Sequence, residues 1–143
     1  MRRSRLISCV FAFVTLLAFS NSFAAETGCK EFVGWLIYPN HDSSASLTEQ
    51  HCGDKKYWQL VTREGKVLTQ IPVPLLTKGY EFNYGDCNLD SKLRHDIIAM
   101  VHHKNDVEWS TKISKAWLAD LTLKTIVPIS TEGLSCRNEG YGL

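Results

Sequence analysis

The chain has 143 residues, 16 basic and 15 acidic side chains, and a formal net charge of +1 at neutral pH. Three of its arginines lie within the first five residues, so the rest of the chain carries 13 basic and 15 acidic side chains, a net charge near −2. This balance excludes the basic surface typical of nucleic-acid-binding proteins. The length is enough for one domain with its own core and too short for two.

Residues 1–24 have the three parts of an export signal. Arginines at the start precede an apolar stretch of 14 residues, 6–19, and Ser22-Phe23-Ala24 has the small-x-small pattern of a cleavage site. The apolar stretch is shorter than the roughly 20 residues that cross a bilayer. We therefore expect a cleaved signal peptide, export to the bacterial periplasm or medium, and a single exported domain, residues 25–143, without a membrane span.

Two other signal types fit this start less well. Arg2-Arg3 begins a twin-arginine pattern, but Arg5 stands where that pattern has an apolar residue. Cys9 ends a box that resembles a lipoprotein processing site, yet this box precedes the apolar stretch instead of following it. The ordinary secretory route is therefore favoured.

Removal of the signal leaves four cysteines, Cys29, Cys52, Cys87 and Cys136. An even number of cysteines in an oxidising compartment predicts two disulfides. Of the three possible pairings we favour Cys29 with Cys52 and Cys87 with Cys136, because each bridge then closes one of two consecutive blocks of the chain. A four-thiolate zinc site is the alternative, but the chain has no Cys-x-x-Cys motif, and we expect no cofactor.

Five segments early in the mature chain have the composition of β-strands: 31–38, 56–62, 66–73, 80–84 and 96–101. Arg63-Glu64-Gly65 separates the second from the third and predicts a hairpin. Pro72 and Pro74 lack amide donors, so the third strand should lie at a sheet edge there or stop. The apolar run Ile97 to Val101 predicts a central strand that is covered on both faces. The polar, serine-rich segment 41–50 is expected to form an exposed loop.

An apolar pattern with helical spacing runs through Trp109, Ile113, Ala116, Trp117 and Leu121. It predicts a helix at residues 107–119, with Asn105 or Asp106 as its N-terminal cap. The alternative is a second hairpin, because Val107, Trp109 and Thr111 also alternate with polar residues.

A further β-prone segment at 122–129 and a turn at 131–133 complete the expected architecture. The predicted fold class is α+β: a small single domain with a mostly antiparallel sheet, one main helix and two disulfides.

Asp86, Asn88 and Asp90 have the 1, 3, 5 spacing with which calcium loops place their oxygen ligands. Ser91 and Ile97 stand where that pattern has its glycine and its bidentate glutamate. A polar turn, in which the Asp and Asn side chains bond to their own backbone, is therefore the better interpretation, and no metal is expected.

Catalytic patterns are also weak. The adjacent His102 and His103 would point to opposite faces of a strand, which favours solvated histidines over a shared metal ion. Asp96 is the one carboxylate that we would inspect for a perturbed pKa, and the alternative is a strand-end charge facing water. No Gly-x-Ser-x-Gly motif is present. An enzyme is therefore less expected than a binding protein.

Aromatic side chains are numerous enough that some should lie at the surface, where Tyr and Trp commonly anchor protein partners. We expect Tyr38, beside the Pro39-Asn40 turn, and Tyr141, in the polar C-terminal tail, to carry such binding. The tail is either an ordered recognition element or a frayed end.

The leading hypothesis is a small periplasmic, disulfide-stabilised protein that binds a protein partner of the cell envelope, such as a hydrolase inhibitor or an immunity protein. The alternative is a small periplasmic enzyme or ligand carrier that acts on cell-wall sugar or peptide. A deep pocket lined by Asp96, a histidine and a tryptophan would favour this alternative, whereas a flat aromatic patch would favour the binding protein.

Overall fold

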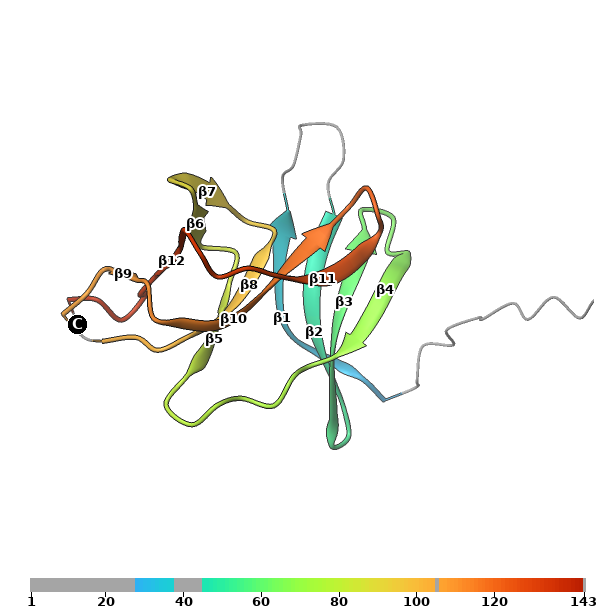
Figure 1. The fold of residues 1–143 in the computed structure, drawn as a ribbon. Helices are drawn as coiled ribbons and strands as arrows, with labels where there is room; N and C mark the ends of the chain where they lie inside the picture. The colour runs from blue at the N-terminus through green and yellow to red at the C-terminus, as the bar shows by residue number, and fades with distance from the viewer. Residues whose placement is uncertain (1–27, 38–44, 105, 143) are drawn as a thin grey trace, which may run out of the picture.

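The computed structural model describes residues 28–37, 45–104 and 106–142, and in these residues every regular element is a β-strand (Figure 1). Three antiparallel four-stranded sheets are formed, here named A, B and C. Sheet A is a meander of β1 (Lys30–Ile37), β2 (Ala45–Cys52), β3 (Lys55–Thr62) and β4 (Val67–Pro72). In the described parts of the chain, no helix is long and apolar enough to cross a membrane.

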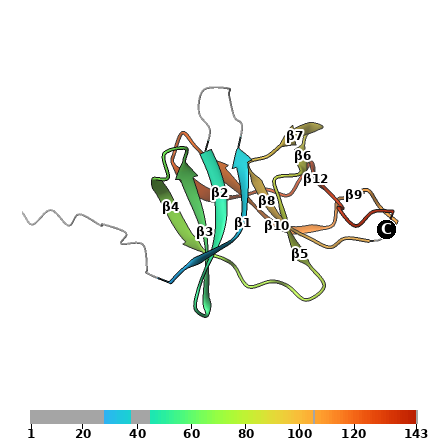
Figure 2. The same ribbon diagram turned by 180° about the vertical axis from the view of Figure 1, so that it is seen from behind.

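The strands of sheets B and C alternate along the second half of the chain, so the chain passes several times from one sheet to the other. Sheet B has the order β11-β10-β8-β5, with β5 (Glu81–Tyr84), β8 (Ile97–Val101), β10 (Ile113–Asp120) and β11 (Thr125–Ile129). Sheet C has the order β7-β6-β12-β9, with β6 (Cys87–Leu89), β7 (Lys92–Arg94), β9 (Trp109–Ser110) and β12 (Leu134–Arg137). Both views place sheet A at one end of the molecule and sheet C at the other, with sheet B between them (Figures 1 and 2).

Sheet B has a core on each of its faces. Towards sheet A, side chains such as Ile98 and Met100 pack against Trp58 and Leu60, and all four are fully buried. On the other face, a second core joins sheet B to sheet C: Cys87, Ile97, Ala99, Val101, Ala116, Leu134 and Cys136. Strand β8 contributes to both cores, and all five of its side chains are buried. The prediction of a central strand covered on both faces is therefore confirmed.

The predicted helix at 107–119 is wrong, and with it the α+β fold class: the described chain is all-β. Consecutive side chains of β10 alternate between the two cores, with Ala116 and Leu118 in one and Trp117 and Ala119 in the other. A strand buried on both faces has apolar residues at every position, including those with helical spacing. Of the expected caps, Asn105 lies outside the described residues.

The alternative interpretation of this segment as part of a second hairpin is correct for β10, which pairs with the next strand, β11, whereas β9 pairs elsewhere. β9 pairs with β12, whereas β10 pairs with β8 and β11. The segment thus joins sheet C to sheet B, and its longer strand, β10, forms a local hairpin with β11.

The predicted loop at 41–50 is also wrong over the residues that the structure describes. Ala45–Cys52 is β2, which pairs with β1 on one side and β3 on the other. Leu47 and Glu49 point towards sheet B and are buried, although Glu49 is charged. A polar sequence became a central strand because partners distant in sequence satisfy its polar groups.

The hairpin predicted at 56–62 and 66–73 is confirmed as β3 and β4. Gly65 takes a φ of +82° in its turn, a left-handed conformation that favours glycine. β4 ends at Pro72 and is an edge strand of sheet A, as the prolines predicted.

Both disulfides have the favoured pairing, Cys29–Cys52 and Cys87–Cys136. Each joins neighbouring antiparallel strands: Cys87 and Cys136 lie directly opposite each other on β6 and β12. Cys29 precedes Lys30, whose partner on β2 is His51, so that Cys29 meets Cys52 in the same way. Their Cα separations are 4.1 Å and 4.0 Å.

We predict that replacing Cys87 and Cys136 together by alanine lowers the free energy of unfolding by about 2 to 5 kcal/mol, because the bridge closes a long loop and both sulfurs are buried. Urea unfolding of the non-reduced proteins measures this loss. The matched control is the double alanine variant of Cys29 and Cys52, whose loop is shorter (23 residues of separation against 49). A larger loss in the control would contradict the loop argument.

Candidate binding groove between two sheet edges

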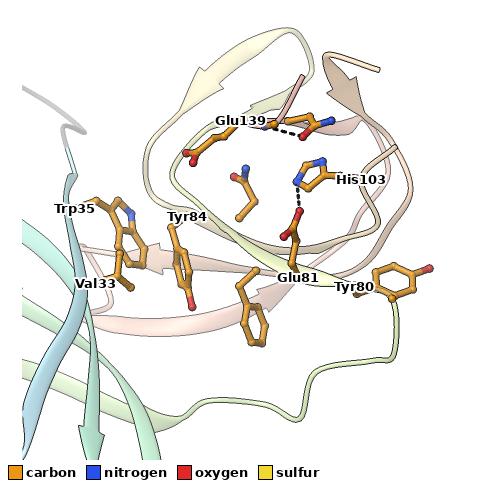
Figure 3. A pocket seen from close by; sticks show the side chains of 12 residues that line it. Val33, Trp35, Tyr80, Glu81, Tyr84, His103 and Glu139 are labelled. Atoms are coloured by element: carbon orange, nitrogen blue, oxygen red, sulfur yellow. Dashed lines mark hydrogen bonds and ion pairs between the residues drawn. The ribbon is translucent and has the colours of Figure 1, made fainter. Parts of the chain in front are cut away.

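An open groove of about 670 Å³ lies between β1, an edge strand of sheet A, and β5, an edge strand of sheet B (Figure 3). β1 provides one wall, β5 the other, and the C-terminal tail crosses one side. The lining residues are Val33, Trp35, Gly79, Tyr80, Glu81, Phe82, Asn83, Tyr84, His103, Asn138, Glu139 and Gly140.

Both strands that flank the groove are edge strands. Within the described residues β1 pairs only with β2, and β5 pairs only with β8. Each strand therefore has one side whose backbone groups are not used by its sheet. The groove is the place where the open edges of the two sheets approach each other.

Trp35 of β1 and Tyr84 of β5 contact each other across the groove, and Figure 3 shows their rings side by side. The ring centroids are 4.7 Å apart, and the indole N–H of Trp35 donates a 3.0 Å hydrogen bond to the carbonyl of His95. Gly85 allows this packing, because a Cβ there would lie 2.8 Å from Cδ1 of Trp35. Its φ of +83° also favours glycine. The position of Trp35 thus depends on a residue without a side chain.

Behind this aromatic pair lies Glu49, a carboxylate that is only 3% exposed. The hydroxyl of Tyr84 donates a hydrogen bond to its Oε2, and His51 Nε2 lies 2.6 Å from its Oε1. Burial alone would raise the pKa of Glu49, but the hydrogen bonds from Tyr84 and His51 outweigh burial and hold the pKa below its ordinary value. Burial, together with the bond to Glu49, raises the pKa of Tyr84. This bond ties sheet A to sheet B at the groove.

The opposite side of the groove carries a contact between a carboxylate and an imidazole, and a buried amide. Glu81 and His103 face each other with 3.5 Å between Oε1 and Nε2 (Figure 3). The side chain of Glu81 is 64% exposed, whereas that of His103 is only 11% exposed. Asn83 is buried and donates from Nδ2 to the carbonyl of Arg137 at 2.9 Å. β5 is therefore fastened to the start of the tail.

The tail is ordered because of Asn138, which is 7% exposed. Its Nδ2 donates to the carbonyls of Lys104 and Val107 at 2.8 Å and 3.1 Å, and its Oδ1 accepts from the N–H of Gly140 at 3.1 Å. These bonds hold Glu139 beside the groove. These bonds attach the start of the tail to the connection that contains Lys104 and Val107, whereas a role of the tail in recognition stays a prediction.

A second hollow of about 310 Å³ adjoins the groove and shares Asn138 and Glu139 with it. It is also lined by Asp86, Glu108, Arg137 and Tyr141. Because they share Asn138 and Glu139, the two hollows are named together the depression between β1, β5 and the tail.

Of the two tyrosines predicted from the sequence, Tyr141 lines the second hollow and is 49% exposed. Tyr38 lies outside the described residues. Trp35, Tyr84, Asn83 and Asn138 belong to the depression and were not predicted from the sequence.

The residues with calcium-loop spacing spread along a hairpin. Asp86 precedes β6, Asn88 lies within it, and Asp90 begins the turn to β7. Asp90 and Ser91 take φ values of +50° and +64° there. Over the described ranges, no three His, Cys, Asp or Glu side chains gather as ligands of one metal ion would.

The two candidates for acid–base chemistry are placed apart. Asp96 is buried and accepts hydrogen bonds from Nε and Nη2 of Arg94 at 2.8 Å and 2.6 Å, so the expectation of a charge facing water is wrong. It does not line the groove. His103 does, but it is largely buried and paired with Glu81, not solvated as expected. In the part of the chain that the structure describes, neither the groove nor the hollow beside Tyr141 brings Asp96 together with a histidine and a tryptophan.

Comparison of the chain with protein-family models, with curated proteins and with solved structures finds no match in any of the three. The class that fold and site define is therefore structural: a disulfide-bridged all-β protein with an open groove between two sheet edges.

We predict that Glu49 contributes stability above its ordinary pKa of 4.5 and loses this contribution as the pH falls, because its pKa is lower in the folded than in the unfolded chain. The difference in unfolding free energy between the wild type and Glu49→Gln should shrink below about pH 4.5. Urea unfolding at a series of values from about pH 3 to about pH 7 measures this difference in unfolding free energy. Exposed Glu132 is the matched control, and an equal slope in Glu132→Gln and Glu49→Gln would contradict the assignment.

We further predict that Tyr84→Phe lowers the free energy of unfolding by about 1.5 to 3 kcal/mol at neutral pH, because it removes a hydrogen bond to a buried carboxylate. Tyr57→Phe is the control, since Tyr57 lies on β3 and is only half-buried. Equal effects of the two substitutions would show that the bond to Glu49 stabilises little.

Proposed function

We propose that this chain is an exported binding protein that holds a segment of a protein partner in the depression between β1, β5 and the tail. One observation carries the proposal: the open edges of two sheets, lined by aromatic and polar side chains, form a groove that is open to solvent. An open groove suits an extended ligand better than it suits a small molecule, because small molecules usually bind in enclosed pockets.

Export is proposed from the signal-like residues 1–24. The two disulfides and the lack of a membrane-spanning helix in the described ranges are consistent with an extracellular or periplasmic protein. A hydrolase inhibitor or an immunity protein of the cell envelope is the most concrete form of the proposal, because such proteins are small, exported and act by binding.

A cell-wall sugar or peptide fragment is the second candidate ligand. The carboxylates of Glu81 and Glu139 and the carboxamides of Asn83 and Asn138 are groups that bind sugar hydroxyls. However, the N–H groups of both carboxamides already donate to main-chain carbonyls. Trp35, the one tryptophan of the lining, is packed on Tyr84 and its N–H bonds to His95. These engagements favour the protein partner.

We predict that Tyr141→Ala weakens partner binding by about 2 kcal/mol or more while the melting temperature stays nearly unchanged, because an exposed tyrosine in a hollow is a typical hot spot. The assay is retention of the partner from periplasmic extract on immobilised protein, followed by titration of the purified partner. Leu123→Ala is the matched control, since Leu123 is 67% exposed in the turn between β10 and β11.

Two results would count against the proposal. Equal binding by the wild type and Tyr141→Ala would place the contact elsewhere. Turnover of cell-wall fragments that is abolished by Glu81→Gln, with no protein retained, would support the second candidate.

A further inference from the structure

We propose that the open edge of β5 accepts an extended, basic segment of the partner as an additional strand of sheet B. This inference rests on the proposed function and adds to it the mode of recognition and the charge of the ligand. Strand addition to an open sheet edge is a common way for proteins to bind polypeptide segments.

The ladder between β5 and β8 shows which backbone groups of β5 have no hydrogen-bond partner among the described residues. The N–H of Gly85 donates to the carbonyl of Ile97 at 2.9 Å. In an antiparallel ladder, bonded positions alternate, so Asn83 and Glu81, opposite Ala99 and Val101, also direct their backbone groups to β8. The backbone N–H and C=O groups of Phe82 and Tyr84 therefore point away from β8.

The other side of β8 follows the same alternation. The N–H of His102 donates to the carbonyl of Lys112, and the carbonyl of Asp96 accepts from the N–H of Ala119. Even-numbered residues of this strand thus bond to β10 and odd-numbered residues face β5. The free groups of Phe82 and Tyr84 are consequently two donors and two acceptors on the groove side, at the spacing that a further strand requires.

The charges that line the depression favour a basic peptide segment over an acidic one. Its two hollows are lined by four carboxylates: Glu81, Glu139, Asp86 and Glu108. The cationic or potentially cationic side chains in the same lining are Arg137 and His103, and His103 is paired with Glu81. An acidic segment would meet repulsion here, whereas lysine or arginine side chains would find complementary charge.

Tyr141 adds to this preference. Its ring lines the second hollow together with Asp86, Glu108 and Glu139. A carboxylate group and an aromatic ring are the two surroundings in which a guanidinium or ammonium group is most favourably held. A lysine or arginine side chain of a segment paired with β5 would thus bind in the second hollow, beside the tail.

The probe is the tightest-binding peptide recovered from a phage-displayed library of random peptides of about 12 residues, selected on the mature, oxidised protein. We expect lysine or arginine at alternate positions of this peptide. Its amides are then methylated in two sets, the odd and the even positions. Only alternate amides of an added strand face β5, so one set should weaken binding about tenfold or more and the other by less than about threefold.

Charge is tested with the same peptide. We expect about tenfold weaker binding to the variant Glu81→Lys/Glu139→Lys, together with weakening as the salt concentration rises. The double variant Glu64→Lys/Glu132→Lys, at exposed positions outside both hollows, should bind as the wild type does. Melting temperatures confirm that the variants are folded.

The outcomes separate this inference from the proposed function. Equal effects of both methylated sets, or binding that ignores salt and the Glu81 and Glu139 substitutions, would overturn the basic added strand while leaving partner binding intact. A captured partner without any peptide binder would also overturn it, since a folded surface would then be recognised. Failure to retain a partner and failure to select a peptide would together overturn both.

Discussion

The burial of β8 on both faces is the constraint on which the rest of the structure depends. Its side chains point alternately into two cores, one shared with sheet A and one with sheet C. Sheet B is therefore a common wall, and a charged side chain at any position of β8 would be buried without a partner. β5 occupies the edge position beside this wall, and its open side forms the groove because β8 already uses its other side.

Local patterns predicted the parts of the fold that local contacts decide. The apolar run Ile97 to Val101 and the hairpin around Gly65 gave correct predictions, because each signal lies within the element it describes. The cysteine pairing was also correct, but it was predicted from the order of the four cysteines along the chain, since the partners are 23 and 49 residues apart. The segment Ala116 to Ala119 was wrongly predicted as helix because it is buried on both faces. Its consecutive apolar residues fit the spacing of a helix as well as that of a strand. β2 could not be predicted, since Glu49 is tolerated in it through Tyr84, 35 residues away.

The depression depends on strand order, which no local pattern encodes. Val33 and Glu81 line the same space because β1 and β5 are both edge strands, and their edge positions follow from the pairing of the other strands. Tyr141 could be selected from the sequence as an exposed aromatic residue. Asn138, which orders the tail around it, could not, because its partners at Lys104 and Val107 come from a distant connection.

Both disulfides join neighbouring strands within one sheet, so neither covalently links sheet A to sheet B. No disulfide sets the distance between β1 and β5; it depends on the core shared by sheets A and B, on the packing of Trp35 on Tyr84 and on the bond from Tyr84 to Glu49. The wall formed by sheet A is cross-linked internally by Cys29–Cys52, whereas the described strands of sheet B carry no disulfide, because Cys87–Cys136 joins two strands of sheet C. Substitutions in the core shared by sheets A and B, for example at Trp58 or Met100, would accordingly change the width of the opening without changing a side chain that lines it.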